Sequence, residues 1–246
     1  MGFLLVLLCG LAVAEEVPDP VAAFLLPPPT QEGSESILLW STHYVLHLAD
    51  EVAAADGLAL RGIDDRPFPP DAPVNLTVKD WCYAALEGSA QIKRLDGELL
   101  TVNYAGTGDL VVDCGPPLGN ARWRTQGTVR FGQANGPYGD GVAGYRLVPY
   151  RTLATDPAVI PTGSVVYIPQ ARGVAFELDG QQRIHDGYFF AADVGGAIKG
   201  LHIDTFTGTE MSPPFPHIGN QPDSRFVAFV LENTGPIEQG LSAAHR

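Results

Sequence analysis

Short apolar segments, separated by glycine- and proline-rich stretches, dominate the chain from residue 99 onward. Segments of this length, rich in β-branched and aromatic residues, are typical of β-strands. We expect strands at residues 100–104, 109–113, 128–131, 147–150, 153–155, 164–168, 174–178, 188–192, 201–206 and 226–231. Short strands joined by turns of this composition predict a mainly β fold, either a closed barrel or a sandwich.

Residues 77–88 have the features of a capped helix. Thr77 is a suitable N-cap, Asp80 follows three residues later, and Gly88 is a suitable stop. Apolar residues between them recur at helical spacing. Residues 37–52 combine strand and helix character. The chain is therefore expected to have a smaller N-terminal part that contains at least one helix.

Two carboxylates bracket a glycine-rich turn in the second half of the chain. Asp193 ends one apolar strand, Gly195 and Gly196 permit a tight turn, and Asp204 lies within the next strand. Alternation along that strand places Asp204 on the same face as His202. A carboxylate beside apolar residues can have its pKa raised enough for acid–base work. A strand–turn–strand unit would bring the two acids to one rim, and paired carboxylates of this kind cleave glycosidic bonds.

Two linked motifs in this region match a known pattern. Residues 193–200 have the sequence Asp-Val-Gly-Gly-Ala-Ile-Lys-Gly, and residues 156–168 have the sequence Asp-Pro-Ala-Val-Ile-Pro-Thr-Gly-Ser-Val-Val-Tyr-Ile. Together they resemble the three-aspartate (3D) domain family, which is shared by membrane-bound lytic transglycosylase A and by small stationary-phase survival proteins. The resemblance covers roughly the last half of the chain. It implies a six-stranded double-psi β-barrel with Asp156, Asp193 and Asp204 in one groove.

The resemblance also implies an activity, the cleavage of the β-1,4 bond between N-acetylmuramic acid and N-acetylglucosamine in peptidoglycan. Asp204 would act as general acid towards the glycosidic oxygen and then as base towards the muramoyl 6-hydroxyl, so that a 1,6-anhydro product forms. Asp193 and Asp156 would complete the catalytic set. Such a reaction needs no cofactor, and we expect none. The implied substrate-binding residues are Gly195, Gly196, Lys199 and Tyr167.

Each of these residues also has a structural interpretation. Asp204 could be an exposed strand carboxylate, and Asp193 could cap the glycine turn. Asp156 precedes a proline, a frequent way to begin a turn, and Lys199 could be a solvated turn charge. Val194 stands where the family usually has threonine, which removes a hydroxyl that could orient Asp193.

Other functions compete with the transglycosylase hypothesis. A non-catalytic, expansin-like module would bind cell-wall polysaccharide without cleaving it, and a hydrolase would use water as the nucleophile. The pairs His185–Asp186 and His202–Asp204 could suggest a metal site, but no Cys or His cluster supplies the remaining ligands. We therefore expect no metal and treat both histidines as polar residues at the barrel rim.

Net charge and chain length narrow the possible functions further. The formal net charge is −13, and no basic stripe is present, so nucleic acid is not an expected partner. With 246 residues, the chain is long enough to bury a sizeable core. The partner that the family resemblance implies is the glycan strand of peptidoglycan, and the oligomeric state is left open.

The distribution of apolar and proline residues predicts the domain organisation. Residues 1–14 form an apolar run with a small-residue cleavage pattern, which indicates a signal peptide and export to a bacterial periplasm or cell envelope. No later segment is apolar enough to span a membrane. Beyond the signal peptide we expect a Pro-rich arm at 15–36, an accessory region at 37–98, the barrel at 99–235 and a tail at 236–246.

Removal of a signal peptide would leave two cysteines, Cys82 and Cys114. In an oxidising compartment the simplest expectation is a disulfide between them. Two buried free thiols are the alternative, because spacing alone does not place the two Cα atoms within bonding range.

Overall fold

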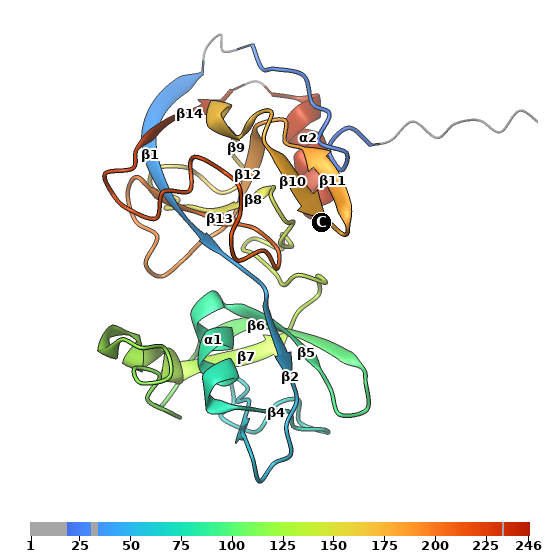
Figure 1. Cartoon of the computed structure of the whole chain (residues 1–246), viewed down its shortest axis with the longest axis vertical. Coiled ribbons are helices and arrows are strands. Elements are labelled where there is room, and N and C mark those ends of the chain that lie inside the picture. Colours follow the sequence, from blue (N-terminus) through green and yellow to red (C-terminus); the bar gives the residue numbers. More distant parts are fainter. Residues whose placement is uncertain (1–18, 31–33, 233) are drawn as a thin grey trace, which may run out of the picture.

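The computed structural model describes residues 19–30, 34–232 and 234–246, and its central feature is a closed β-barrel (Figure 1). Six strands form the barrel in the order β1-β13-β8-β12-β9-β14. The expectation of a mainly β fold with a six-stranded barrel is confirmed. The strands are β1 (Glu35–Tyr44), β8 (Thr152–Ala154), β9 (Val165–Tyr167), β12 (Tyr188–Asp193), β13 (His202–Phe206) and β14 (Phe226–Leu231).

Alternation along the strands explains how the barrel is filled. Phe189 and Ala191 of β12 join Ile203 of β13 and Leu153 of β8 in one buried apolar cluster. The other face of β12 is buried as well, because Phe190 packs in a second cluster with the C-terminal helix. Burial on both faces is the reason why β12 is apolar throughout rather than alternating.

A second domain is built around a four-stranded sheet with the order β2-β5-β6-β7 (Figure 1). Helix α1 packs against this sheet, and its buried residues share one apolar core with the strands. The elements of this domain are β2 (His47–Asp50), β3 (Leu58–Ala59), β4 (Asn75–Leu76), α1 (Val78–Glu87), β5 (Ser89–Lys93), β6 (Leu99–Thr107), the 3₁₀ helix η1 (Ala121–Thr128) and β7 (Val129–Gln133).

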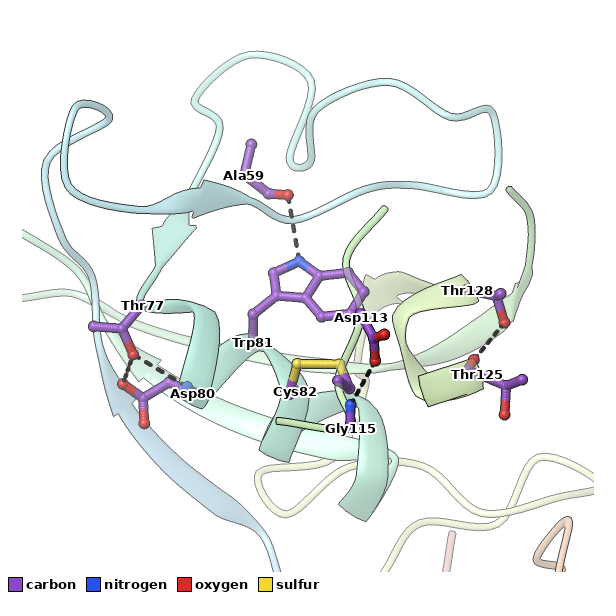
Figure 2. Close-up of a disulfide and its surroundings, with 10 residues drawn as sticks. Ala59, Thr77, Asp80, Trp81, Cys82, Asp113, Gly115, Thr125 and Thr128 are labelled. Atoms are coloured by element: carbon purple, nitrogen blue, oxygen red, sulfur yellow. Dashed lines mark hydrogen bonds between the residues drawn. A yellow bond between two sulfur atoms is a disulfide. The ribbon is translucent and has the colours of Figure 1, made fainter. Parts of the chain in front are cut away.

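Helix α1 begins and ends at the expected residues. The Thr77 hydroxyl accepts a hydrogen bond from the Asp80 amide, and Gly88 ends the helix in the left-handed conformation. Figure 2 shows the cap together with the disulfide between Cys82 and Cys114, whose Cα atoms are 5.5 Å apart. The disulfide ties α1 to the loop before η1, and the expected pairing is confirmed.

The expected domain boundaries need correction. The barrel takes its first strand from residues 35–44, whereas residues 99–133 belong to the sheet of the second domain. The chain therefore starts in the barrel, leaves it to form the second domain, and returns at β8. Local sequence could not reveal this, because β1 pairs with β13 and β14, more than 150 residues later. The segments 109–113 and 147–150, expected as strands, are loops.

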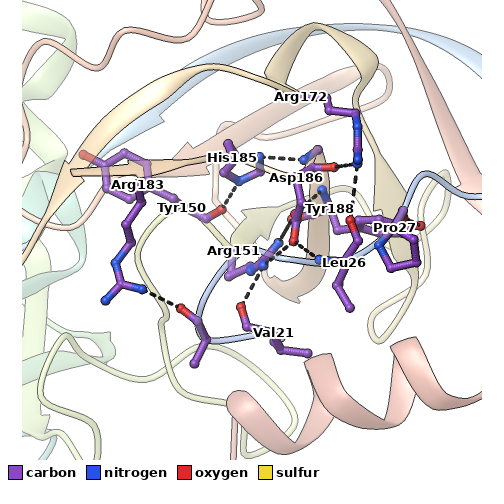
Figure 3. Close-up of polar contacts among 12 residues, drawn as sticks. Val21, Leu26, Pro27, Tyr150, Arg151, Arg172, Arg183, His185, Asp186 and Tyr188 are labelled. Carbon is purple, nitrogen blue, oxygen red and sulfur yellow. Dashed lines mark hydrogen bonds and ion pairs between the residues drawn. The ribbon is translucent and has the colours of Figure 1, made fainter. Parts of the chain in front are cut away.

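The N-terminal arm packs on the barrel around a buried ion pair, shown in Figure 3. Arg151 binds Asp186 through two hydrogen bonds of 2.6 and 2.8 Å, and both side chains are almost fully buried. Arg151 also donates to the Val21 carbonyl, and Asp186 accepts from the Leu26 amide. These hydrogen bonds fix the arm to the barrel surface. The predicted signal peptide, 1–14, lies outside the described residues.

The rest of the chain covers the barrel. A hairpin is formed by β10 (Ala175–Leu178) and β11 (Gln181–Ile184), after the short 3₁₀ helix η2 (Pro169–Ala171). The expected tail, 236–246, is instead largely helical, because α2 (Pro236–Ala244) buries Leu241 against the barrel. Among the described residues, no helix has the length and apolar character that crossing a membrane would need.

Candidate active site

One row of residues crosses four strands of the barrel. Thr42 on β1 is in register with Asp204 on β13, Asp204 with Ala154 on β8, and Ala154 with Asp193 on β12. Since neighbouring strands lie about 4.8 Å apart, the two aspartates are about 10 Å apart at their backbones. Strand β8 lies between β12 and β13 in the barrel. The expected strand–turn–strand unit is therefore not a simple hairpin. The barrel nevertheless brings the two acids together.

The row lies on the outer face of the barrel. Ile203 and Thr205 are buried on the inner side, whereas Asp204 between them is half-buried on the outer side, as alternation predicts. Around it is a small apolar cluster that includes Tyr44, Ala154 and Phe206. The acids therefore sit beside apolar groups without being sealed inside the core.

Asp204 has the environment of an acid that can hold a proton near neutral pH. Burial raises its pKa to about 7, and the nearby carboxylates of Glu87 and Asp193 act in the same direction. A hydrogen bond from Thr42 opposes them, because Thr42 Oγ1 lies 2.8 Å from Asp204 Oδ1 and stabilises the charged form. Burial changes the pKa of Asp204 more than the Thr42 hydrogen bond does.

Asp193 is held more firmly. The Tyr44 hydroxyl donates to its Oδ2 at 2.8 Å, and the Val194 amide donates to its Oδ1 at 2.8 Å. Burial raises the pKa of Asp193 to about 6, and both hydrogen bonds lower it. Asp193 is thus ionised over a wider pH range than Asp204, so the two carboxyls have different proton affinities, as an acid and its electrostatic partner need.

A third carboxylate enters from the second domain. Glu87 lies at the end of α1 and accepts a hydrogen bond of 3.0 Å from the Val45 amide, directly after β1. Burial also raises the pKa of Glu87. The segment 42–45 thus donates to three acids, through Thr42, Tyr44 and Val45. No sequence motif marked these residues, because their relation to the aspartates depends on β1 pairing with β13.

Asp156 binds the backbone of the glycine-rich turn. Its carboxylate accepts from the Gly200 amide at 2.8 Å and from the Ala158 amide at 3.1 Å. These bonds, assisted by the charge of Lys199, lower the pKa of Asp156. The third aspartate therefore stays ionised and positions the turn, which agrees with its structural interpretation.

The remaining predicted site residues differ in their surroundings. Lys199 is exposed in the turn. Gly195 packs so tightly that an added Cβ would lie 2.5 Å from Ile198 Cγ1, whereas Gly196 faces open space. Tyr167 is almost fully buried on β9 and packs on Tyr188, so its assignment to the substrate site is not supported by its position.

The two His–Asp pairs lie in different environments. His185 is buried in the core and stacks on Phe189, and burial lowers its pKa to about 3, so it is no rim residue. Its neighbour Asp186 is held by Arg151. His202 does lie at the site, stacked on Trp40 with 3.6 Å between the ring centroids. Within the described parts of the chain, no group of three His, Cys, Asp or Glu residues is placed to hold a metal ion.

Comparisons with known proteins find a family model for the segment that carries the three aspartates. Residues 151–213 match the family model described as the 3D domain, and this span contains Asp156, Asp193 and Asp204. A comparison with curated proteins finds no sequence match.

Two solved structures share the fold. Escherichia coli MltA with bound chitohexaose is 18% identical with a TM-score of 0.53, and the match covers 79% of this chain and 72% of that one. A membrane-bound lytic murein transglycosylase from Agrobacterium tumefaciens is 15% identical with a TM-score of 0.53, and the match covers 85% of this chain and 79% of that one. At these identities the likeness shows the fold, which extends over both the barrel and the second domain.

Proposed function

We propose that this chain, which carries a 3D domain within an MltA-like fold, is a peptidoglycan lytic transglycosylase with Asp204 as its general acid and base. The observation that carries the proposal is the placement of Asp204. It is half-buried on the outer barrel face, its pKa is raised to about 7, and a second carboxylate lies across one strand. A protonated carboxyl at neutral pH is what cleavage of a glycosidic bond requires.

In the first step, protonated Asp204 gives its proton to the oxygen that links N-acetylmuramic acid to N-acetylglucosamine. The bond from that oxygen to C1 of the muramoyl sugar breaks, and positive charge develops on the sugar ring. Asp193, ionised above its pKa of about 6, supplies negative charge near the site. Preorganised charge of this kind stabilises an oxocarbenium-like transition state.

In the second step, Asp204 is a carboxylate and accepts the proton of the muramoyl 6-hydroxyl. The oxygen of that hydroxyl bonds to C1 and closes the 1,6-anhydro ring, while Asp204 returns to its protonated form. The nucleophile belongs to the substrate, and attack within one molecule has a large effective concentration. One carboxyl therefore serves both steps, and Asp193 need not exchange a proton.

The substrate class is supported by the fold and by the disulfide. The MltA structure holds chitohexaose, a β-1,4-linked aminosugar oligosaccharide, which supports an aminosugar chain as the ligand here. The disulfide between Cys82 and Cys114 suits an oxidising compartment outside the cytoplasm, where peptidoglycan lies.

The test is product analysis of purified peptidoglycan by mass spectrometry. Wild-type protein should release muropeptides with 1,6-anhydro ends, and Asp204→Asn should release none while still binding the polymer. Glu98→Gln, which removes an exposed acid of the second domain, is the matched control and should keep activity. Reducing ends would indicate a hydrolase, binding without products would indicate an expansin-like module, and either result overturns the proposal.

A further inference from the structure

A chain of hydrogen bonds joins His202 to Asp204 through one hydroxyl group. His202 Nε2 lies 2.9 Å from Thr42 Oγ1, and Thr42 Oγ1 lies 2.8 Å from Asp204 Oδ1. The register places Thr42 directly opposite Asp204, with Trp40 opposite His202. The three groups are therefore neighbours because of the strand pairing.

The Thr42 hydroxyl carries a single proton, and this limits what the chain can do. When Asp204 is ionised, Thr42 donates to it, and His202 Nε2 must carry a hydrogen to complete the chain. When Asp204 is protonated, it can donate to Thr42, and Thr42 donates to an unprotonated His202 Nε2. Each protonation state of Asp204 thus requires one form of the imidazole.

We infer that His202 is a positioning residue that favours the protonated, acid form of Asp204 by accepting a hydrogen bond from the Thr42 hydroxyl. This inference rests on the proposed function only for its catalytic meaning, since the coupling itself needs no substrate. It adds to the mechanism a residue that acts through Thr42 on the proton state of the catalytic acid.

Stacking orients the imidazole, and burial favours its neutral form. The ring stacks on Trp40 with an angle of 5° between the planes, which fixes the direction of Nε2. Because Nε2 faces Thr42, a neutral ring that carries its hydrogen on Nδ1 accepts at Nε2. Burial also lowers the pKa of His202, which favours the neutral ring.

The other charged and titratable groups around Asp204 do not supply this effect. Asp193 on β12 and Glu87 on α1 act on Asp204 through their charge. Tyr44 on β1 donates its hydroxyl to Asp193. His202 is the group joined to Asp204 through a shared hydroxyl, so removal of Thr42 should uncouple the two, whereas charge effects would persist.

A double-mutant cycle isolates the coupling. His202→Phe keeps an aromatic ring on Trp40 but removes the acceptor, so Thr42 is free to stabilise ionised Asp204. The pKa of Asp204 should then fall by about one unit, the size expected for one hydrogen bond. In the Thr42→Val background, the same His202→Phe change should leave the pKa of Asp204 unmoved. His202→Gln retains an acceptor and should keep the pKa near the wild-type value.

The readout is the ¹³C titration of the Asp204 carboxyl, with the ¹⁵N shifts of His202 followed in the same samples. Between the pKa of His202, which is lowered, and that of Asp204, which is about 7, Nε2 should be unprotonated, and it should gain hydrogen character as Asp204 ionises. Equal shifts in both Thr42 backgrounds, or a tautomer that ignores the Asp204 titration, would overturn the inference. Both measurements omit peptidoglycan, so a protein without anhydro products would fail the proposed function and leave this test intact.

Discussion

The Tyr44 hydroxyl reaches across two strands of the barrel to donate a 2.8 Å hydrogen bond to Asp193. Tyr44 is on β1 and Asp193 on β12, with β13 and β8 between them. Asp204 lies on β13 within this span, so the bond holds Asp193 beside it. The first strand of the chain, which carries none of the three-aspartate motif, thus organises the motif's acids.

Replacing Tyr44 with phenylalanine should raise the pKa of Asp193 above about 6, because the hydroxyl stabilises the charged carboxylate. A larger share of Asp193 would then be neutral near pH 7 and would repel the charge on Asp204 less, so the pKa of Asp204 should fall. Carboxyl ¹³C titration measures both values. Tyr138→Phe is the matched control, since it removes a tyrosine–aspartate bond to Asp179. An Asp193 titration unchanged in Tyr44→Phe would contradict the assignment.

Glu87→Gln should lower the pKa of Asp204, because it removes a like charge while an amide oxygen can still accept from Val45. If Asp204 must be protonated to act, activity should decline as pH rises through about 7 in the wild type and at lower pH in the variant. We expect a shift of less than about one pH unit, since charges in a partly hydrated site interact weakly. A pH–rate profile tests this, with Glu98→Gln as control. Superimposable profiles would exclude a role for Glu87.

Asp204→Asn should stabilise the protein at pH 8 and have little effect at pH 4. The folded-state pKa of Asp204 is raised, so its favourable contribution is present below the unfolded-state pKa of about 4 and is lost as pH rises through about 7. Asparagine avoids the cost of an ionised, half-buried carboxylate. Thermal unfolding at both pH values measures the difference. Asp156→Asn should instead destabilise the protein at pH 8, because the pKa of Asp156 is lowered and its charge stabilises the turn fully above the unfolded-state pKa of about 4.

Asp186→Asn should destabilise the barrel by about 3–5 kcal/mol, because it leaves the buried Arg151 guanidinium without its counter-charge. The arm at 19–30 should also exchange its amide hydrogens faster, since Asp186 accepts from Leu26. Chemical denaturation and hydrogen exchange provide the two measurements. Asp64→Asn, which breaks an exposed pair with Arg66, should cost at most about 1 kcal/mol. Equal losses in the free energy of unfolding for the two variants would show that the buried pair stabilises the fold no more than the exposed pair does.

Several features could be predicted from the sequence because they depend on neighbouring residues. Helix α1 follows from the Thr77 cap and the Gly88 stop, and the common face of His202 and Asp204 follows from alternation along β13. The turn between Asp193 and Asp204 has the glycines that its backbone needs, including Gly200 with a positive φ of 62°. These are local rules of capping, pleat and backbone conformation.

Tertiary structure alone decided which residues surround the acids. Thr42 and Tyr44 reach the site because β1 closes the barrel against β13, and Glu87 reaches it because the chain enters the second domain directly after β1. His185, expected at the rim, lies in the core. Pairing between strands more than 150 residues apart, and burial created by that pairing, cannot be deduced from local patterns. The sequence determined the acids and their strands, whereas the closed barrel determined their hydrogen-bond partners and proton affinities.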